Sequence, residues 1–93
     1  MKTVLLYRPN SDHERVVIDY LRDFHRQTGK ELETIDVDSR EGIALCQLYD
    51  IMQFPAIVVT DNGGAILSHW VGQPLPRISE VSYYVQDDRQ TVR

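Results

Sequence analysis

The pattern of hydrophobic and polar positions predicts seven elements in the order β-α-β-α-β-β-α. Residues 2–7 and 56–60 are apolar runs too short for helices, so they predict buried strands. Residues 31–37 alternate apolar with polar positions, and residues 65–71 follow a turn; both predict further strands. Apolar residues at helical spacing predict helices from Ser11 to a stop at Gly29, over 38–50 and over about 75–86.

Each predicted helix has a stripe that should face the core. The positions expected on the first stripe are Val16, Val17, Tyr20, Leu21 and Phe24. Those expected on the second are Ile43, Cys46 and Tyr49, with Ala44, Leu48 and Ile51 beside them. A single core-facing stripe is typical of a helix that covers one face of a sheet.

Both helices begin with residues that favour a capping box. Ser11 precedes Glu14 by three positions, and Asp38 stands in the same relation to Glu41. We expect the Ser11 hydroxyl to accept from the amide of residue 14 and Glu14 to reach back to the amide of Ser11. The same spacing predicts that Asp38 opens the second helix.

A hairpin with a proline at its mouth is the strongest local signal in the chain. Pro55 precedes the apolar run 56–60, where a residue that cannot donate to a ladder is tolerated. Residues 61–64 read Asp-Asn-Gly-Gly, and Asn and Gly accept the positive φ of tight turns. The strand 65–71 then ends at Gly72.

Length and composition fit one soluble domain, expected over residues 1–86 with a polar tail over 87–93. The net charge of −4 offers no basic surface, so we expect no nucleic acid partner. No apolar stretch is long enough to span a membrane, and the run at the N-terminus is too short for a signal peptide. We therefore expect a cytoplasmic protein without a cofactor.

From Tyr49 through Pro55 and the hairpin to Gly72, the chain resembles the C-terminal half of thioredoxin-like proteins. The resemblance covers most of the chain, from Thr3 to about Val85. It implies a mixed four-stranded sheet with helices on both faces, two parallel strands being joined by the antiparallel hairpin. It also implies a cis bond before Pro55, with Phe54 at the border of a substrate groove.

The redox signature of this family is absent. In thioredoxins and glutaredoxins a Cys-x-x-Cys pair lies between the first strand and the first helix; the matching segment here is Ser11-Asp12-His13-Glu14. Cys46 is the one cysteine of the chain, and we expect it to be a buried core residue. Dithiol exchange needs two thiols, so it is excluded. A Ser11–His13 catalytic pair and a metal site on this turn are both disfavoured, because neighbouring helix residues do not converge.

The resemblance points to a groove where the first helix, the segment before Pro55 and the loop at Gly72 meet. The residues expected there are Tyr7, Arg8, Ser11, Met52, Phe54, Pro55, Trp70 and Gly72. For Phe54 and Trp70 a place in the core remains an equal alternative.

Three functions remain open. The first is a non-catalytic module that binds a protein partner, or itself, at the groove. The alternative is a glutathione- or thiol-handling protein in which Ser11 replaces the nucleophilic cysteine; Arg8 is the one nearby cation for glutathione. The third is a dimer that forms through an edge strand.

Overall fold

The computed structural model describes residues 2–85, and their elements follow the predicted order. The elements are β1 (Lys2–Tyr7), α1 (Glu14–Thr28), β2 (Glu33–Asp36), α2 (Arg40–Tyr49), β3 (Ala56–Thr60), β4 (Ile66–Val71) and α3 (Ile78–Ser82). The predicted tail over 87–93 lies outside the described residues. No described helix has the length and apolar character that a membrane crossing would need.

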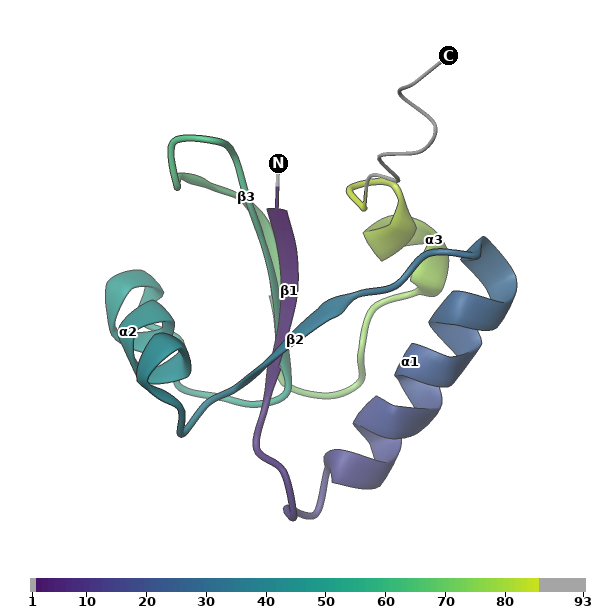
Figure 1. Ribbon diagram of the computed structural model, residues 1–93, viewed down its shortest axis with the longest axis horizontal. Helices are drawn as coiled ribbons and strands as arrows, with labels where there is room; N and C mark the ends of the chain where they lie inside the picture. Colours follow the sequence, from purple (N-terminus) through teal and green to yellow (C-terminus); the bar gives the residue numbers. More distant parts are fainter. Residues whose placement is uncertain (1, 86–93) are drawn as a thin grey trace.

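The four strands form one mixed sheet in the order β2-β1-β3-β4. β1 and β2 are parallel, and the pairs β1–β3 and β3–β4 are antiparallel. In Figure 1 the sheet is seen edge-on, with α2 on one face and α1 and α3 on the other. This is the α/β arrangement with helices on both faces that the sequence predicted.

The sheet separates two cores. The α2-side core lies between the sheet and α2; its buried residues are Val4, Leu6, Ile35, Val37, Ile51, Ala56 and Val58. The α1-side core lies between the sheet, α1 and α3; its buried residues are Leu5, Val17, Phe24, Leu32, Ile57 and Val81. Successive residues of β1 and β3 enter opposite cores, which explains why these two strands are continuous apolar runs.

Three predicted boundaries were wrong by a few residues. β2 spans four residues instead of the predicted 31–37, although Val37 still donates its N–H to the Tyr7 carbonyl at 3.1 Å. β4 begins at Ile66 instead of residue 65. α3 spans only Ile78–Ser82 instead of 75–86, although Val81 enters the α1-side core as its spacing predicted.

The predicted capping box of the second helix was also wrong. Ser39 is the N-cap of α2, and its hydroxyl accepts from the N–H of Gly42 at 3.0 Å. Asp38 lies one residue before the cap.

The buried faces of α1 and α2 differ from the predicted stripes. Val16 is 42% exposed, so the covered side of α1 runs through Val17, Tyr20, Leu21 and Phe24. Ile43 and Leu48 of α2 are exposed, contrary to the prediction. Cys46 and Tyr49 pack against the sheet as predicted, and Leu45 joins them there.

The reason for the orientation of α2 is a backbone contact at Gly42. A Cβ at this position would lie 2.1 Å from the carbonyl oxygen of Asp36 and 2.8 Å from the Cα of Val37. The first turn of α2 therefore rests directly on the end of β2, and Gly42 is the one buried residue of the helix. Positions three, four and seven residues further on then face the sheet as well.

We predict that Gly42→Ala destabilises the protein. Alanine favours a helix over glycine by about 1 kcal/mol, whereas overpacking costs about 1–3 kcal/mol. Because the obstacle at Gly42 is backbone, the overpacking cost should dominate, with a net loss of about 2 kcal/mol in the free energy of unfolding, measured with urea. The control is Gly63→Ala, where the nearest atom would be 3.5 Å away and little change is expected. An unchanged midpoint in Gly42→Ala would contradict the close approach.

A second prediction concerns Tyr20, whose hydroxyl is buried and has no hydrogen-bond partner among the described residues. Burial, reinforced by the nearby Glu80 carboxylate, raises the pKa of Tyr20 to about 12. The folded state thus favours the neutral phenol, a contribution present below pH 10 and lost as pH rises from about 10 to about 12. Tyr20→Phe should raise the unfolding free energy at neutral pH by about 1 kcal/mol, because it removes an unsatisfied group.

The matched control for this prediction is Tyr83→Phe, since the Tyr83 ring is exposed and its hydroxyl should contribute nothing. Thermal or urea unfolding at neutral pH and again near pH 11 measures both effects. A loss of stability in Tyr20→Phe at neutral pH would mean that the hydroxyl has a partner.

Candidate functional site

The segment that replaces the redox motif is a loop folded back on Arg8. The backbone N–H of Arg8 donates to Nε2 of His13 at 3.1 Å, and the hydroxyl of Ser11 donates to the Arg8 carbonyl. Glu14 donates its N–H to the Ser11 carbonyl at 3.2 Å. Asn10 has a φ of 62°, in the left-handed region that asparagine tolerates. The loop is thus closed by its own hydrogen bonds.

The predicted Ser11–Glu14 capping box was wrong. α1 begins at Glu14, its N-cap is His13, and no side chain caps it. The Ser11 hydroxyl donates to the carbonyl of Arg8 instead of accepting a hydrogen bond from a backbone amide of the helix. An accepting Nε2 on His13 places the ring proton on Nδ1. Ser11 and His13 both form hydrogen bonds with the backbone of Arg8, and they do not form a nucleophile–base pair.

The side chain of Arg8 joins three segments at this end of the sheet. Its Nε and Nη2 donate to the two carboxylate oxygens of Asp38 at 3.1 and 3.3 Å, a fork that fixes the plane of the guanidinium. Its guanidinium carbon lies 5.9 Å from the centre of the Phe54 ring, a cation–π contact. The end of β1, the β2–α2 turn and the segment before Pro55 therefore meet at Arg8.

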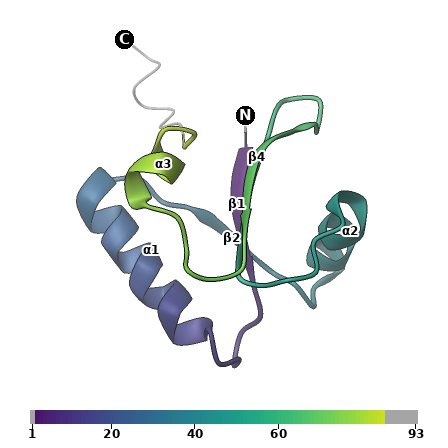
Figure 2. The ribbon, with the colours of Figure 1, turned by 180° about the vertical axis from the view of Figure 1, so that it is seen from behind.

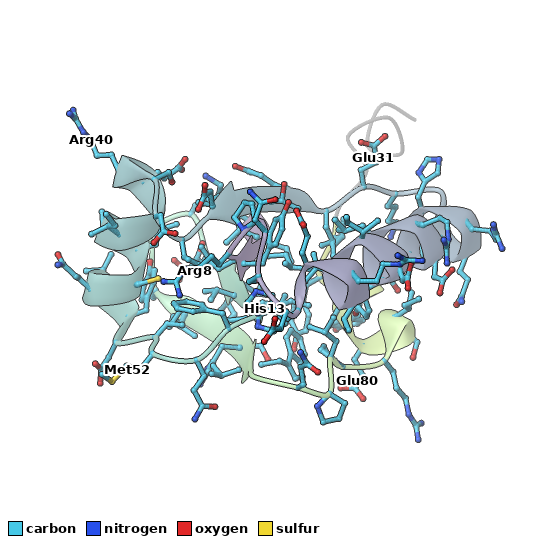
Figure 3. All side chains as sticks on the ribbon, turned by 90° about the horizontal axis from the view of Figure 1, so that it is seen from below. Arg8, His13, Glu31, Arg40, Met52 and Glu80 are labelled. Carbon is cyan, nitrogen blue, oxygen red and sulfur yellow. The ribbon has the colours of Figure 1, made fainter. Side chains whose placement is uncertain are left out.

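The segment around Pro55 is held by the hairpin. The Phe54–Pro55 peptide bond is cis, and Pro55 is buried. Gly72, with a φ of 82°, donates its N–H to the Pro55 carbonyl at 2.9 Å. Phe54 is half-buried against the α2-side core, whereas Met52 is 82% exposed. Figure 3 shows Arg8 and His13 close together and Met52 further out, pointing away from the ribbon.

The remaining predicted site residues pack on the other face of the sheet. Trp70 and Tyr7 lie against the α1-side core, and Trp70 meets Tyr84 edge-to-face with ring centres 6.0 Å apart. Both Phe54 and Trp70 are half-buried, so neither is wholly enclosed in a core. The structure brings Arg8, Phe54 and Pro55 together and places Tyr7 and Trp70 behind them.

Cys46 lies on α2, close enough to Arg8 to feel its charge. It is half-buried against the α2-side core, whereas we had expected it to be fully buried. Burial raises the pKa of its thiol, and the positive charge of Arg8 partly offsets this effect. A raised pKa means less thiolate at neutral pH, and the thiolate is the reactive form.

Sequence reasoning missed two of the residues that contact Arg8, namely His13 and Asp38. It considered His13 only as a catalytic or metal-binding residue and disfavoured both roles, and it took Asp38 as a helix cap. Both act on Arg8, which is five residues from His13 and thirty from Asp38. No periodicity or spacing links these positions, so only the fold could reveal their partner.

No known protein family matches the chain, and no curated protein is similar enough in sequence to match. Among solved structures, thioredoxin 1 from the thermophilic eubacterium Thermosipho africanus is similar to it, with a TM-score of 0.59 and 15% sequence identity. The match covers 99% of this chain and 96% of that one. The protein therefore has a thioredoxin-like fold, and with one cysteine it has no Cys-x-x-Cys pair.

We predict that replacing Ser39 and replacing Ser11 by alanine have different effects on stability. Ser39→Ala removes the cap of α2 and should lower the unfolding free energy by about 1 kcal/mol. Ser11→Ala removes a bond to the Arg8 carbonyl in an exposed loop and should cost less, about 0.5 kcal/mol. Parallel urea titrations of both variants measure the difference. An equal or larger loss in Ser11→Ala would restore its role as a cap.

Proposed function

We propose that this protein is a redox-inactive binding module, which holds an extended segment of a protein partner at the groove around Pro55. The observation that carries the proposal is the combination of Met52, almost fully exposed, with the Arg8 guanidinium held over Phe54. Exposed methionine and arginine-stacked aromatic rings are typical of protein interfaces. Met52 at 82% exposure contributes little to the core, and its position three residues before Pro55 suits recognition of a chain.

The orientation of the arginine supports the proposal further. Asp38 and Phe54 hold the guanidinium, and both the Arg8 and Asp38 side chains stay more than half exposed. An exposed ion pair of this kind adds little stability, about 0–1 kcal/mol. Its main effect is to hold a planar donor group in place at the surface, where a partner's carbonyl or carboxylate oxygens could accept from it.

The glutathione-handling alternative has less support. Ser11, which would replace the nucleophilic cysteine, donates its hydroxyl to the Arg8 carbonyl. Arg8, the one nearby cation expected to hold glutathione, is paired with Asp38. A titration with reduced glutathione, followed by NMR shifts of the Ser11 and Arg8 amides, separates the two functions.

We predict that Met52→Ala and Phe54→Ala reduce partner binding. The immobilised protein captures partners from a lysate of the source cell, and each captured partner is then titrated against the purified variants. Anchor residues cost about 2 kcal/mol on truncation, so the dissociation constant should rise about 30-fold.

The matched control is Leu48→Ala, because Leu48 is 70% exposed on α2 and lies outside the proposed groove residues. It should bind as the wild type does. Circular dichroism confirms that each variant is folded. If Met52→Ala and Phe54→Ala bind the captured partner like wild type, the groove is not the binding surface.

A further inference from the structure

β4 forms one of the two edges of the sheet, and β2 forms the other. Among the described residues β4 pairs with β3 on one side and with no strand on the other. Figure 2 looks onto this edge: β4 crosses the centre of the view, α1 and α3 lie to one side, α2 lies to the other, and no helix covers the strand. An open edge offers unpaired backbone groups to another strand.

The hydrogen bonds of the hairpin determine which backbone groups are free. Gly72 donates to the carbonyl of Pro55, and the register pairs Ile57 with Trp70 and Val59 with Ser68. Because bonded and non-bonded pairs alternate along an antiparallel ladder, Trp70 and Ser68 direct their backbone groups toward β3. His69 and Val71 lie between them, so their N–H and C=O groups point to the open edge.

The sequence of β4 lacks the features that usually keep an edge from pairing. Ile66–Val71 contains neither proline nor any Asp, Glu, Lys or Arg. Leu67 is 49% exposed and Val71 40% exposed. The one protective irregularity is the register shift opposite Val59 and Thr60, and it lies at the turn end of the strand.

We propose that β4 pairs antiparallel with β4 of a second copy of this chain, with the two-fold axis at His69. The two sheets then form one sheet of eight strands. His69 would exchange two backbone hydrogen bonds with His69 of the second copy, and Val71 would lie opposite Leu67 of that copy, the residue that the register shift leaves without a partner on β3. This inference goes beyond the groove around Pro55 and does not depend on it.

The choice of a second copy rests on self-complementarity. With the axis at His69, Leu67 of each copy lies opposite Val71 of the other, so both exposed aliphatic pairs are covered. Side-chain pairs that lie directly opposite each other across two strands are the contacts that stabilise a sheet. On the other face Ser68 of each copy lies opposite Trp70 of the other. Only His69 meets itself across the axis.

The arrangement predicts a charge-reversal pattern. His69→Glu alone and His69→Lys alone each place like charges directly across the axis, and each should raise the dimer dissociation constant about tenfold or more. An equimolar mixture of the two variants places opposite charges there and should restore the dimer. Sedimentation equilibrium measures all three samples and the wild type. His69 is exposed, so neither substitution disturbs a core.

The controls are Gln47→Glu and Gln47→Lys, at an exposed position of α2; both should associate like wild type. A second pair, Leu67→Lys mixed with Val71→Glu, tests the register independently if a His69 variant fails to fold. Amide hydrogen exchange adds a direct readout: the amides of His69 and Val71 should be protected in the wild type and lose protection in His69→Glu, while Trp70 stays protected.

The results distinguish the proposal from its alternatives. A dissociation constant of about 1 mM marks a weak complex. A wild-type protein that stays monomeric at a concentration of about 1 mM therefore overturns the proposal. So does a His69→Glu dimer as tight as wild type, or a mixture that fails to associate. A dimer that is lost in Met52→Ala but unchanged in His69→Glu would place self-association at the groove.

Discussion

The structure depends on the antiparallel pair of β1 and β3, which is buried on both faces. Val4, Leu6 and Val58 enter one core, and Leu5 and Ile57 enter the other. Every helix packs against one face of this pair, and β2 and β4 extend it on either side. The loops that follow β1 and precede β3 leave the sheet at the same end, because the two strands run in opposite directions. Arg8 and Phe54 meet there for that reason.

Much of this fold could be predicted from local patterns. β1, β3 and the turn over 61–64 were predicted correctly, because a doubly buried strand must be continuously apolar and a tight turn needs residues such as Asn and Gly. The face of α2 could not be predicted in the same way. Its orientation depends on Gly42, and a residue without a side chain does not enter a hydrophobic pattern.

The candidate site shows a second limit of sequence reasoning. A serine hydroxyl can accept from a helix amide or donate to a nearby carbonyl, and both choices fit the same spacing. Ser11 takes the second choice because the loop turns back at Asn10 and brings the Arg8 carbonyl within reach. His13 and Asp38 also act on Arg8, from the loop and from the β2–α2 turn. Arg8 and Ser11 were predicted as groove residues, but His13 and Asp38 were not, and neither was the contact of Ser11 with the Arg8 carbonyl.

The groove and the open edge would occupy different parts of the same hairpin. The proposed groove residues Pro55 and Gly72 lie where β3 begins and β4 ends, whereas the proposed axis crosses β4 near its middle. A two-fold axis perpendicular to the sheet reverses the direction of the strands. The two grooves of such a dimer would therefore open at opposite ends of the eight-stranded sheet. One short extended segment could not reach both, so each copy would hold its own partner segment, and self-association would bring two such segments onto one particle without competing for their binding surface.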